Sequence, residues 1–139
     1  MRDDITALLL QSRLFARIPP SNIERIGQLI EPLEVSASDV VVRQGDISDY
    51  YYIIEAGRCE VLRELDDSEP QSLAQLSNGQ SFGEEALITN SQRNATIRML
   101  TDGVLLRLTR DYFIELISAP LLHEVSHERA EYLLATGAR

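Results

Sequence analysis

The residues with the clearest chemical potential lie in one stretch near the middle of the chain. Phe82-Gly83-Glu84-Glu85-Ala86 is followed, after a polar loop, by Arg93-Asn94-Ala95. Gly83 lets the backbone turn close to another group, and Glu84 with the residues after it can begin a short helix. The unpaired N–H groups of a first helical turn favour an anion, and an arginine binds an anion with two parallel hydrogen bonds. This spacing predicts an anion-binding turn.

Glu84 indicates which anion the turn would suit. A carboxylate beside a phosphate is repelled by it, and this cost is offset only if the carboxylate binds another part of the ligand. Glu84 could do so by accepting a hydrogen bond from a ribose hydroxyl. Arg93 and Glu84 together therefore favour a sugar phosphate. Either residue alone is weaker evidence, because a single arginine before a strand is usually solvated and a Glu-Glu pair usually begins a helix.

A second motif would imply different chemistry. His123-Glu124-Val125-Ser126-His127 matches H-E-x-x-H, the helix motif of zinc metalloproteases. That chemistry needs both histidines on one helix, a third ligand and a catalytic domain around them. We interpret Ser126 as the cap of a new helix, and the nearby Glu128 and Glu131 are too close in sequence to complete a metal site. Two surface histidines at chance spacing are the better interpretation.

The charge balance narrows the choice of partner. The chain has 139 residues, with 13 Lys+Arg against 22 Asp+Glu and a formal net charge of −9. This length fits one hydrophobic core. The acidity argues against nucleic acid or an anionic membrane as the partner, so an anionic ligand would need a dedicated arginine.

The cysteine count and the hydropathy indicate the cellular compartment of the protein. Cys59 is the single cysteine, which excludes an intramolecular disulfide and predicts a small buried apolar residue. The chain contains neither a run of ~20 apolar residues nor a signal-peptide core, because Leu8-Leu9-Leu10 is too short. We therefore expect a cytoplasmic protein.

Helical patterns occur at both ends of the chain. Residues 3–12 have apolar side chains at helical spacing, and Ser21-Asn22-Ile23-Glu24 fits a capping box that opens a helix ending before Pro32. Residues 112–117 form another apolar helical face, which Ala119-Pro120 should break. A last helix is expected from Ser126 to Thr136, ending at Gly137.

Between these ends the pattern is that of β-structure. Short apolar runs separated by turn residues predict strands at Val40–Val42, Tyr50–Ile54, Cys59–Leu62, Leu73–Leu76, Ile97–Leu100 and Val104–Leu108. No helical segments separate them often enough for a parallel α/β sheet. The sequence therefore predicts a mainly β fold with flanking helices, in the form of a sandwich, jelly roll or barrel.

The central motif, together with its neighbours, resembles a known family. Phe82 to Leu87 followed by Arg93 to Thr96 looks like the phosphate-binding cassette of cyclic nucleotide-binding domains. These domains occur in bacterial cAMP-responsive regulators, protein kinase regulatory subunits and cyclic nucleotide-gated channels. Further likenesses are Leu14-Phe15 with Ile18-Pro19, Arg43 to Asp46, and Tyr52 to Gly57, so that the resemblance covers about residues 10–120. It implies a double-stranded β-helix (jelly roll) with a short cassette helix and terminal α-helices.

The resemblance also implies which residues bind the ligand, cAMP or cGMP. They are Phe82, Gly83, Glu84, Glu85, Ala86, Arg93, Asn94 and Ala95. Arg93 would pair with the cyclic phosphate, Glu84 would bind the ribose 2′-hydroxyl, and backbone amides would line the anion. Glu85 stands where the family often has an apolar residue. Asn94 stands where it often has a small or hydroxylated one, which leaves the choice between adenine and guanine open.

The implied function is that of a non-enzymatic bacterial sensor without a cofactor. Residues 1–120 would form the nucleotide-binding domain, and residues 121–139 a helical lid or the start of a downstream domain. The nucleotide would move the C-terminal helices, with Phe82 and residues 112–117 as parts of the hinge. Residues 126–138 resemble the opening of rhodanese-like domains. A homodimer and a ligand-free interaction module on the same fold are alternatives.

Overall fold

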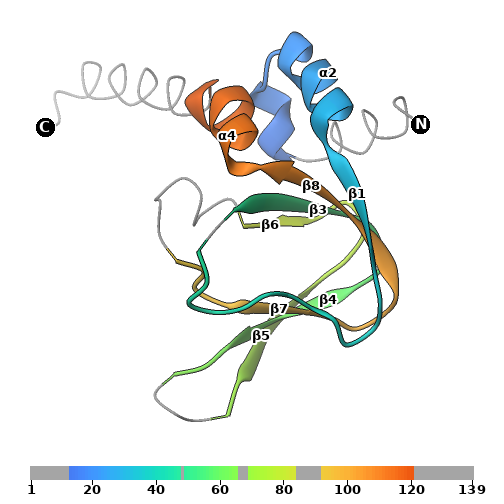
Figure 1. The fold of residues 1–139 in the computed structure, drawn as a ribbon, viewed down its shortest axis with the longest axis vertical. Helices are drawn as coiled ribbons and strands as arrows, with labels where there is room; N and C mark the ends of the chain where they lie inside the picture. Colours follow the sequence, from blue (N-terminus) through green and yellow to red (C-terminus); the bar gives the residue numbers. More distant parts are fainter. Residues whose placement is uncertain (1–12, 48, 66–68, 84–91, 121–139) are drawn as a thin grey trace, which may run out of the picture.

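The computed structural model describes residues 13–47, 49–65, 69–83 and 92–120. They form eight strands and a few short helical segments (Figure 1). The helical segments are η1 (Arg13–Arg17), α2 (Pro20–Leu29), α4 (Arg110–Phe113) and η2 (Ile114–Ser118). The strands are β1 (Glu31–Val35), β2 (Val40–Val42), β3 (Tyr50–Ala56), β4 (Cys59–Arg63), β5 (Gln71–Leu76), β6 (Ser81–Phe82), β7 (Thr96–Met99) and β8 (Gly103–Thr109).

The strands make two four-stranded sheets that face each other. One has the order β1-β8-β3-β6 and the other β2-β7-β4-β5, with antiparallel pairing throughout these strands. Neighbouring strands in each sheet are mostly far apart in sequence, as in a jelly roll. The predicted mainly β fold is therefore confirmed.

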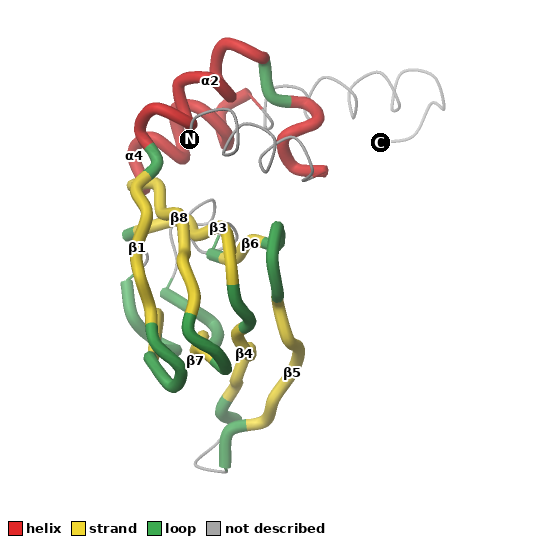
Figure 2. The backbone as a smooth tube through the Cα atoms, turned by 90° about the vertical axis from the view of Figure 1, so that its right-hand side faces the viewer, coloured by secondary structure: helices red, strands yellow, loops and turns green. Residues whose placement is uncertain are grey.

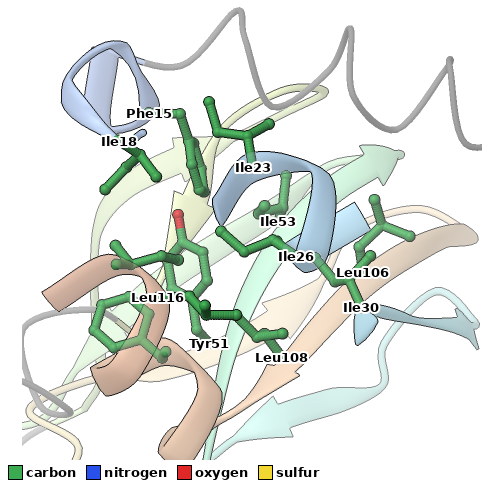
Figure 3. Packing of buried hydrophobic residues seen from close by; sticks show 12 residues of the cluster. Phe15, Ile18, Ile23, Ile26, Ile30, Tyr51, Ile53, Leu106, Leu108 and Leu116 are labelled. Atoms are coloured by element: carbon green, nitrogen blue, oxygen red, sulfur yellow. The ribbon is translucent and has the colours of Figure 1, made fainter. Parts of the chain in front are cut away.

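The described helices cover the outer face of the first sheet and gather at one end of the molecule (Figure 2). The central strands of this sheet, β3 and β8, are consequently buried on both faces. On β8, Leu106 and Leu108 pack against the helices, whereas Leu105 points between the sheets. Figure 3 shows the helix-facing core, in which Tyr51 of β3 lies among apolar side chains from the helices and from β8.

Helix α2 begins two residues earlier than the capping box predicted, because the N-cap is residue 19 and not residue 21. Pro19 occupies the N-cap position without a side-chain cap, and Pro20 is the first helical residue. The predicted box at Ser21 and Glu24 is therefore wrong. Proline suits the first helical position, because its φ is already helical and its missing N–H would have had no partner there. The predicted apolar face is confirmed, since Ile23 and Ile26 are buried.

The expected apolar face after β8 is also confirmed, because Phe113 and Leu116 are buried. Thr109 caps α4 by accepting a hydrogen bond from the Tyr112 N–H at 3.5 Å, and the chain continues into the π-helix η2. The predicted break at Ala119-Pro120 is wrong, since both residues are helical. Pro120 cannot donate to the carbonyl four residues earlier, that of Leu116, and Asn22 Nδ2 of α2 donates to it instead at 3.1 Å.

Two strands, β1 and β6, were missed by the sequence patterns. β1 contains Pro32 and is largely exposed, as an edge strand can be. The helices expected at residues 3–12 and 126–136 lie outside the described residues. Among the described helices, none has the length and apolar character needed to cross a bilayer.

Candidate functional site

Arg93 is held in place by the turn that follows β2. Its N–H donates to the Asp46 carbonyl at 2.8 Å, and its carbonyl accepts from the Gly45 N–H at 2.8 Å. The neighbouring residues Gln92 and Ile47 form an isolated antiparallel bridge. The backbone of Arg93 is thereby fixed just before β7, with its side chain only 5% exposed.

The Arg93 guanidinium lies against the Gly83 turn. Gly83 has φ +99°, and a β-carbon built on it would collide with Arg93 Nη1. Arg93 Nη2 donates a hydrogen bond to the Tyr50 carbonyl, and Cζ lies 6.0 Å from the centre of the Tyr52 ring. Glycine at position 83 therefore supplies both the left-handed backbone and the space for the arginine. Burying this charge makes an oxyanion a favourable neighbour for the guanidinium.

Aromatic side chains extend the site across the first sheet. Tyr52 of β3 pairs with Phe82 of β6 on one side and with Arg107 of β8 on the other. The Tyr52 and Phe82 rings are stacked, with centres 5.0 Å apart and an interplanar angle of 17°. Burial raises the pKa of the Tyr52 hydroxyl above its ordinary value of 10.0, although Arg93 and Arg107 act in the opposite direction. Tyr52 is therefore a neutral side chain between two cations at neutral pH.

Arg107 was missed by the sequence analysis. It lies in the apolar run of β8, two positions from Leu105, and therefore shares with Leu105 the face between the sheets. Its Cζ lies 4.5 Å from the centre of the Tyr50 ring. The signal that could have identified Arg107 is a charged residue within the apolar run of β8. The sequence alone did not tell which face of the strand this residue occupies.

A cavity of about 340 Å³ adjoins Arg107 and Tyr52. It lies between the two sheets at the edges formed by β1 and β2, and both strands contribute to its walls. Leu33 and Val41 supply apolar surface. The site thus consists of a buried arginine at a glycine turn, a stacked aromatic pair, and a cavity next to a second arginine.

The structure brings together three of the eight predicted ligand residues. Phe82, Gly83 and Arg93 converge, whereas Asn94 is exposed and Ala95 is half-buried. Glu84, Glu85 and Ala86 lie outside the described residues, as do His123 and His127. Within the described ranges, the His, Cys, Asp and Glu side chains form no cluster of three or more that could hold a metal ion.

The family model described as "Cyclic nucleotide-binding domain" matches residues 32–119. The chain belongs to this family. The matched range contains all eight strands except the first residue of β1, and it includes Gly83 and Arg93. The predicted family resemblance is thereby confirmed.

Relatives of this cyclic nucleotide-binding domain include a protein kinase regulatory subunit and a protein kinase. The chain is 37% identical over 92 residues to the cAMP-dependent protein kinase regulatory subunit of Blastocladiella emersonii, covering 66% of the chain and 23% of that protein. It is 30% identical over 112 residues to a cGMP-dependent protein kinase of Drosophila melanogaster, covering 81% of the chain and 10% of that protein. The chain therefore spans less than a quarter of either relative.

A solved structure has the same architecture. The regulatory domain of Toxoplasma gondii PKA, co-crystallised with cAMP, superposes with a TM-score of 0.79 at 27% identity. The match covers 84% of this chain and 44% of that one. The family's jelly-roll fold is thus the fold of this chain.

Proposed function

We propose that this domain binds a cyclic nucleotide between its two sheets, with the cyclic phosphate at Arg93. The observation that carries the proposal is the position of the Arg93 guanidinium, which is buried inside the roll directly against the glycine turn at Gly83. A glycine turn admits a phosphate close to backbone N–H groups, and the arginine supplies the counter-charge. The names of the two relatives, a regulatory subunit of a cAMP-dependent kinase and a cGMP-dependent kinase, support this class of ligand.

The remaining ligand contacts in this proposal come from the residues next to Gly83 and Arg93 in sequence. Glu84 binds the ribose 2′-hydroxyl, and the amides of Glu85, Ala86 and Asn94 line the phosphate. Ala95 and Phe82 complete the wall of the site. An arginine that faces the phosphate and a glutamate that faces the ribose would together select a nucleotide over inorganic phosphate.

We propose further that occupancy is passed to the C-terminal helices through β3. Adjacent residues of this strand face opposite sides: the Tyr52 ring stacks on Phe82 at the ligand side, and the Tyr51 ring lies 4.8 Å from Phe113 of α4. A shift of β3 on ligand binding would therefore move both contacts. In this proposal residues 1–120 are a non-catalytic sensor, and residues 121–139 are its lid or lead into an effector domain.

Isothermal titration calorimetry with cAMP and cGMP tests the binding proposal. The wild type should give a heat of binding with at least one nucleotide. Arg93→Ala should abolish this heat, because the phosphate would lose its water shell without gaining a counter-charge. Arg63→Ala is the matched control, since Arg63 is an exposed arginine at the end of β4. A nucleotide at 100 times its Kd should also stabilise the wild type by about 2.7 kcal/mol in a thermal melt.

The alternative function is a ligand-free interaction module. It would be favoured if neither nucleotide produced heat or stabilisation in the wild type. Unchanged affinity in Arg93→Ala, with the variant folded, would instead place the phosphate elsewhere.

A further inference from the structure

Arg107 carries hydrogen-bond donors into the interior of the roll. Its Nε is inaccessible to solvent and has no hydrogen-bond partner among the described residues, and within these ranges it makes no ion pair. Arg107 Cζ lies 4.5 Å from the centre of the Tyr50 ring, and Arg107 also lines the cavity beside Tyr52, so that a ligand in this cavity can contact the guanidinium donors. Leaving such donors unsatisfied costs free energy, and a ligand with matching acceptors recovers it.

The cavity beside Arg107 combines apolar walls with polar and charged groups. Its walls include the apolar side chains of Leu33, Val35 and Val41, and Tyr52 borders it. Apolar walls with a few directed polar groups are typical of sites for planar heterocycles. A volume of about 340 Å³ is ample for a base with part of its sugar.

Two carboxylates add acceptors to the donors of Arg107. Glu34 and Asp39 line the same cavity and are exposed, which places them at its mouth. One oxygen of Asp39, Oδ2, accepts from the Ser36 N–H at 2.8 Å, and the other is left for further bonds. The cavity therefore offers a cation at its inner side and carboxylates toward solvent.

This pattern distinguishes guanine from adenine. Guanine presents two acceptors, O6 and N7, on one edge, which a bidentate arginine matches. Its N1–H and 2-amino group are donors that suit carboxylates. Adenine carries a donor, its 6-amino group, where guanine carries O6. This amino group would face the N–H donors of Arg107 and could not form a hydrogen bond with them.

Tyr52 connects this cavity to the proposed phosphate site. The ring of Tyr52 lies 6.0 Å from Arg93 Cζ, and the same residue borders the cavity. The two arginines therefore flank one side chain, and a ligand with its phosphate at Arg93 lies within reach of Arg107. We infer that Arg107 is a specificity-determining residue that binds O6 and N7 of a guanine base, so that the domain prefers cGMP to cAMP. This inference rests on the proposed function.

The experiment is calorimetric titration of the wild-type chain with cGMP, cAMP and cyclic inosine monophosphate. We expect cGMP to bind about tenfold to a hundredfold more tightly than cAMP, the range of a bidentate arginine–guanine contact. Cyclic inosine monophosphate, which keeps O6 and N7 but lacks the 2-amino group, should bind closer to cGMP than to cAMP. Wild-type affinity for cAMP equal to or above that for cGMP would overturn the inference without using any variant.

Two substitutions locate the effect at Arg107. Arg107→Gln should weaken the affinity for cGMP about tenfold or more and the affinity for cAMP less than about threefold. Arg107→Lys keeps the charge but loses the planar pair of donors, so it should also lower the ratio of cGMP affinity to cAMP affinity below that of the wild type. Arg63→Gln is the control and should change neither affinity. Equal losses for both nucleotides in Arg107→Gln would overturn the assignment.

The outcomes separate this inference from the proposed function. If the wild type binds both nucleotides equally, the proposed function stands and the role of Arg107 is overturned. If it binds neither, both are overturned. A melt of each variant shows whether a loss of affinity accompanies a loss of folding.

Discussion

The Arg93 guanidinium occupies the space that a β-carbon at Gly83 would fill. The two residues are ten positions apart in the chain, and the contact joins the end of β6 to the residue that leads into β7. The backbone at position 83 is therefore as much a part of the site as the arginine itself. A glycine that only formed a turn would leave open space beside it.

Gly83→Ala should consequently impair ligand binding as well as stability. The substitution imposes a positive φ on alanine, which costs about 1–2 kcal/mol, and its methyl group would displace Arg93. Gly57→Ala is the matched control, because Gly57 has φ +114° and its added methyl group meets Asp102 and Thr101, not Arg93. We expect both variants to melt at lower temperature, and only Gly83→Ala to lose nucleotide affinity in calorimetry. Similar affinity losses in both would show that backbone strain alone is responsible.

The first sheet should be sensitive to substitution on both of its faces. Leu105 and Leu106 are adjacent on β8, each at most 1% exposed, and they belong to different cores. Truncating either leucine to alanine should lower the unfolding free energy by about 2–5 kcal/mol, since each leaves a cavity. Leu73→Ala on β5 is the control, because Leu73 is 55% exposed, and it should change stability by less than about 0.5 kcal/mol. Urea denaturation measures all three, and tolerance of either buried truncation would contradict the two-core arrangement.

The parts of this molecule that the sequence predicted are those encoded by contiguous residues. Gly83 and Arg93 belong to one motif, and their meeting in space follows from a single short connection. Arg107 was missed because its role depends on which face of β8 it occupies, and both faces of that strand are buried. The start of α2 was misjudged because two helix-start signals overlap, and the proline at position 20 prevailed over the serine that follows it.

The Cys59 thiol should make the fold less stable in alkali. Burial raises the pKa of Cys59 from its ordinary 9.0 to about 11. Between these values the unfolded chain has lost the proton that the folded chain keeps, so the unfolding free energy falls as pH rises. We expect a contribution of up to about 2.7 kcal/mol, fully present below pH 9 and lost toward pH 11, because the pKa differs by about two units between the folded and the unfolded chain.

Urea denaturation of the wild type and of Cys59→Ala at pH 8, 9, 10 and 11 measures this contribution. The variant loses packing at every pH and is therefore less stable than the wild type. The difference in unfolding free energy between the two proteins should shrink as pH rises, because only the wild type has a thiol that ionises on unfolding. Iodoacetamide should label the native protein slowly, since the side chain is fully buried. A constant difference in unfolding free energy across this range, or rapid native labelling, would be inconsistent with the buried thiol.

Asn22 should couple α2 to the C-terminal helix. Its Nδ2 donates to the Leu116 carbonyl at 3.1 Å, and the N–H that would bond this carbonyl in an α-helix is missing because residue 120 is proline. Asn22→Ala should lower the unfolding free energy by about 1 kcal/mol and loosen the packing of η2. Hydrogen exchange of the amides of Leu116 and Ile117 should accelerate, while those of β4 keep their protection. Pro120→Ala tests the cause: it restores a donor for the Leu116 carbonyl, so that Asn22→Ala should cost less in this background than in the wild type. An equal cost in both backgrounds would show that the asparagine does not replace the hydrogen bond that proline removes.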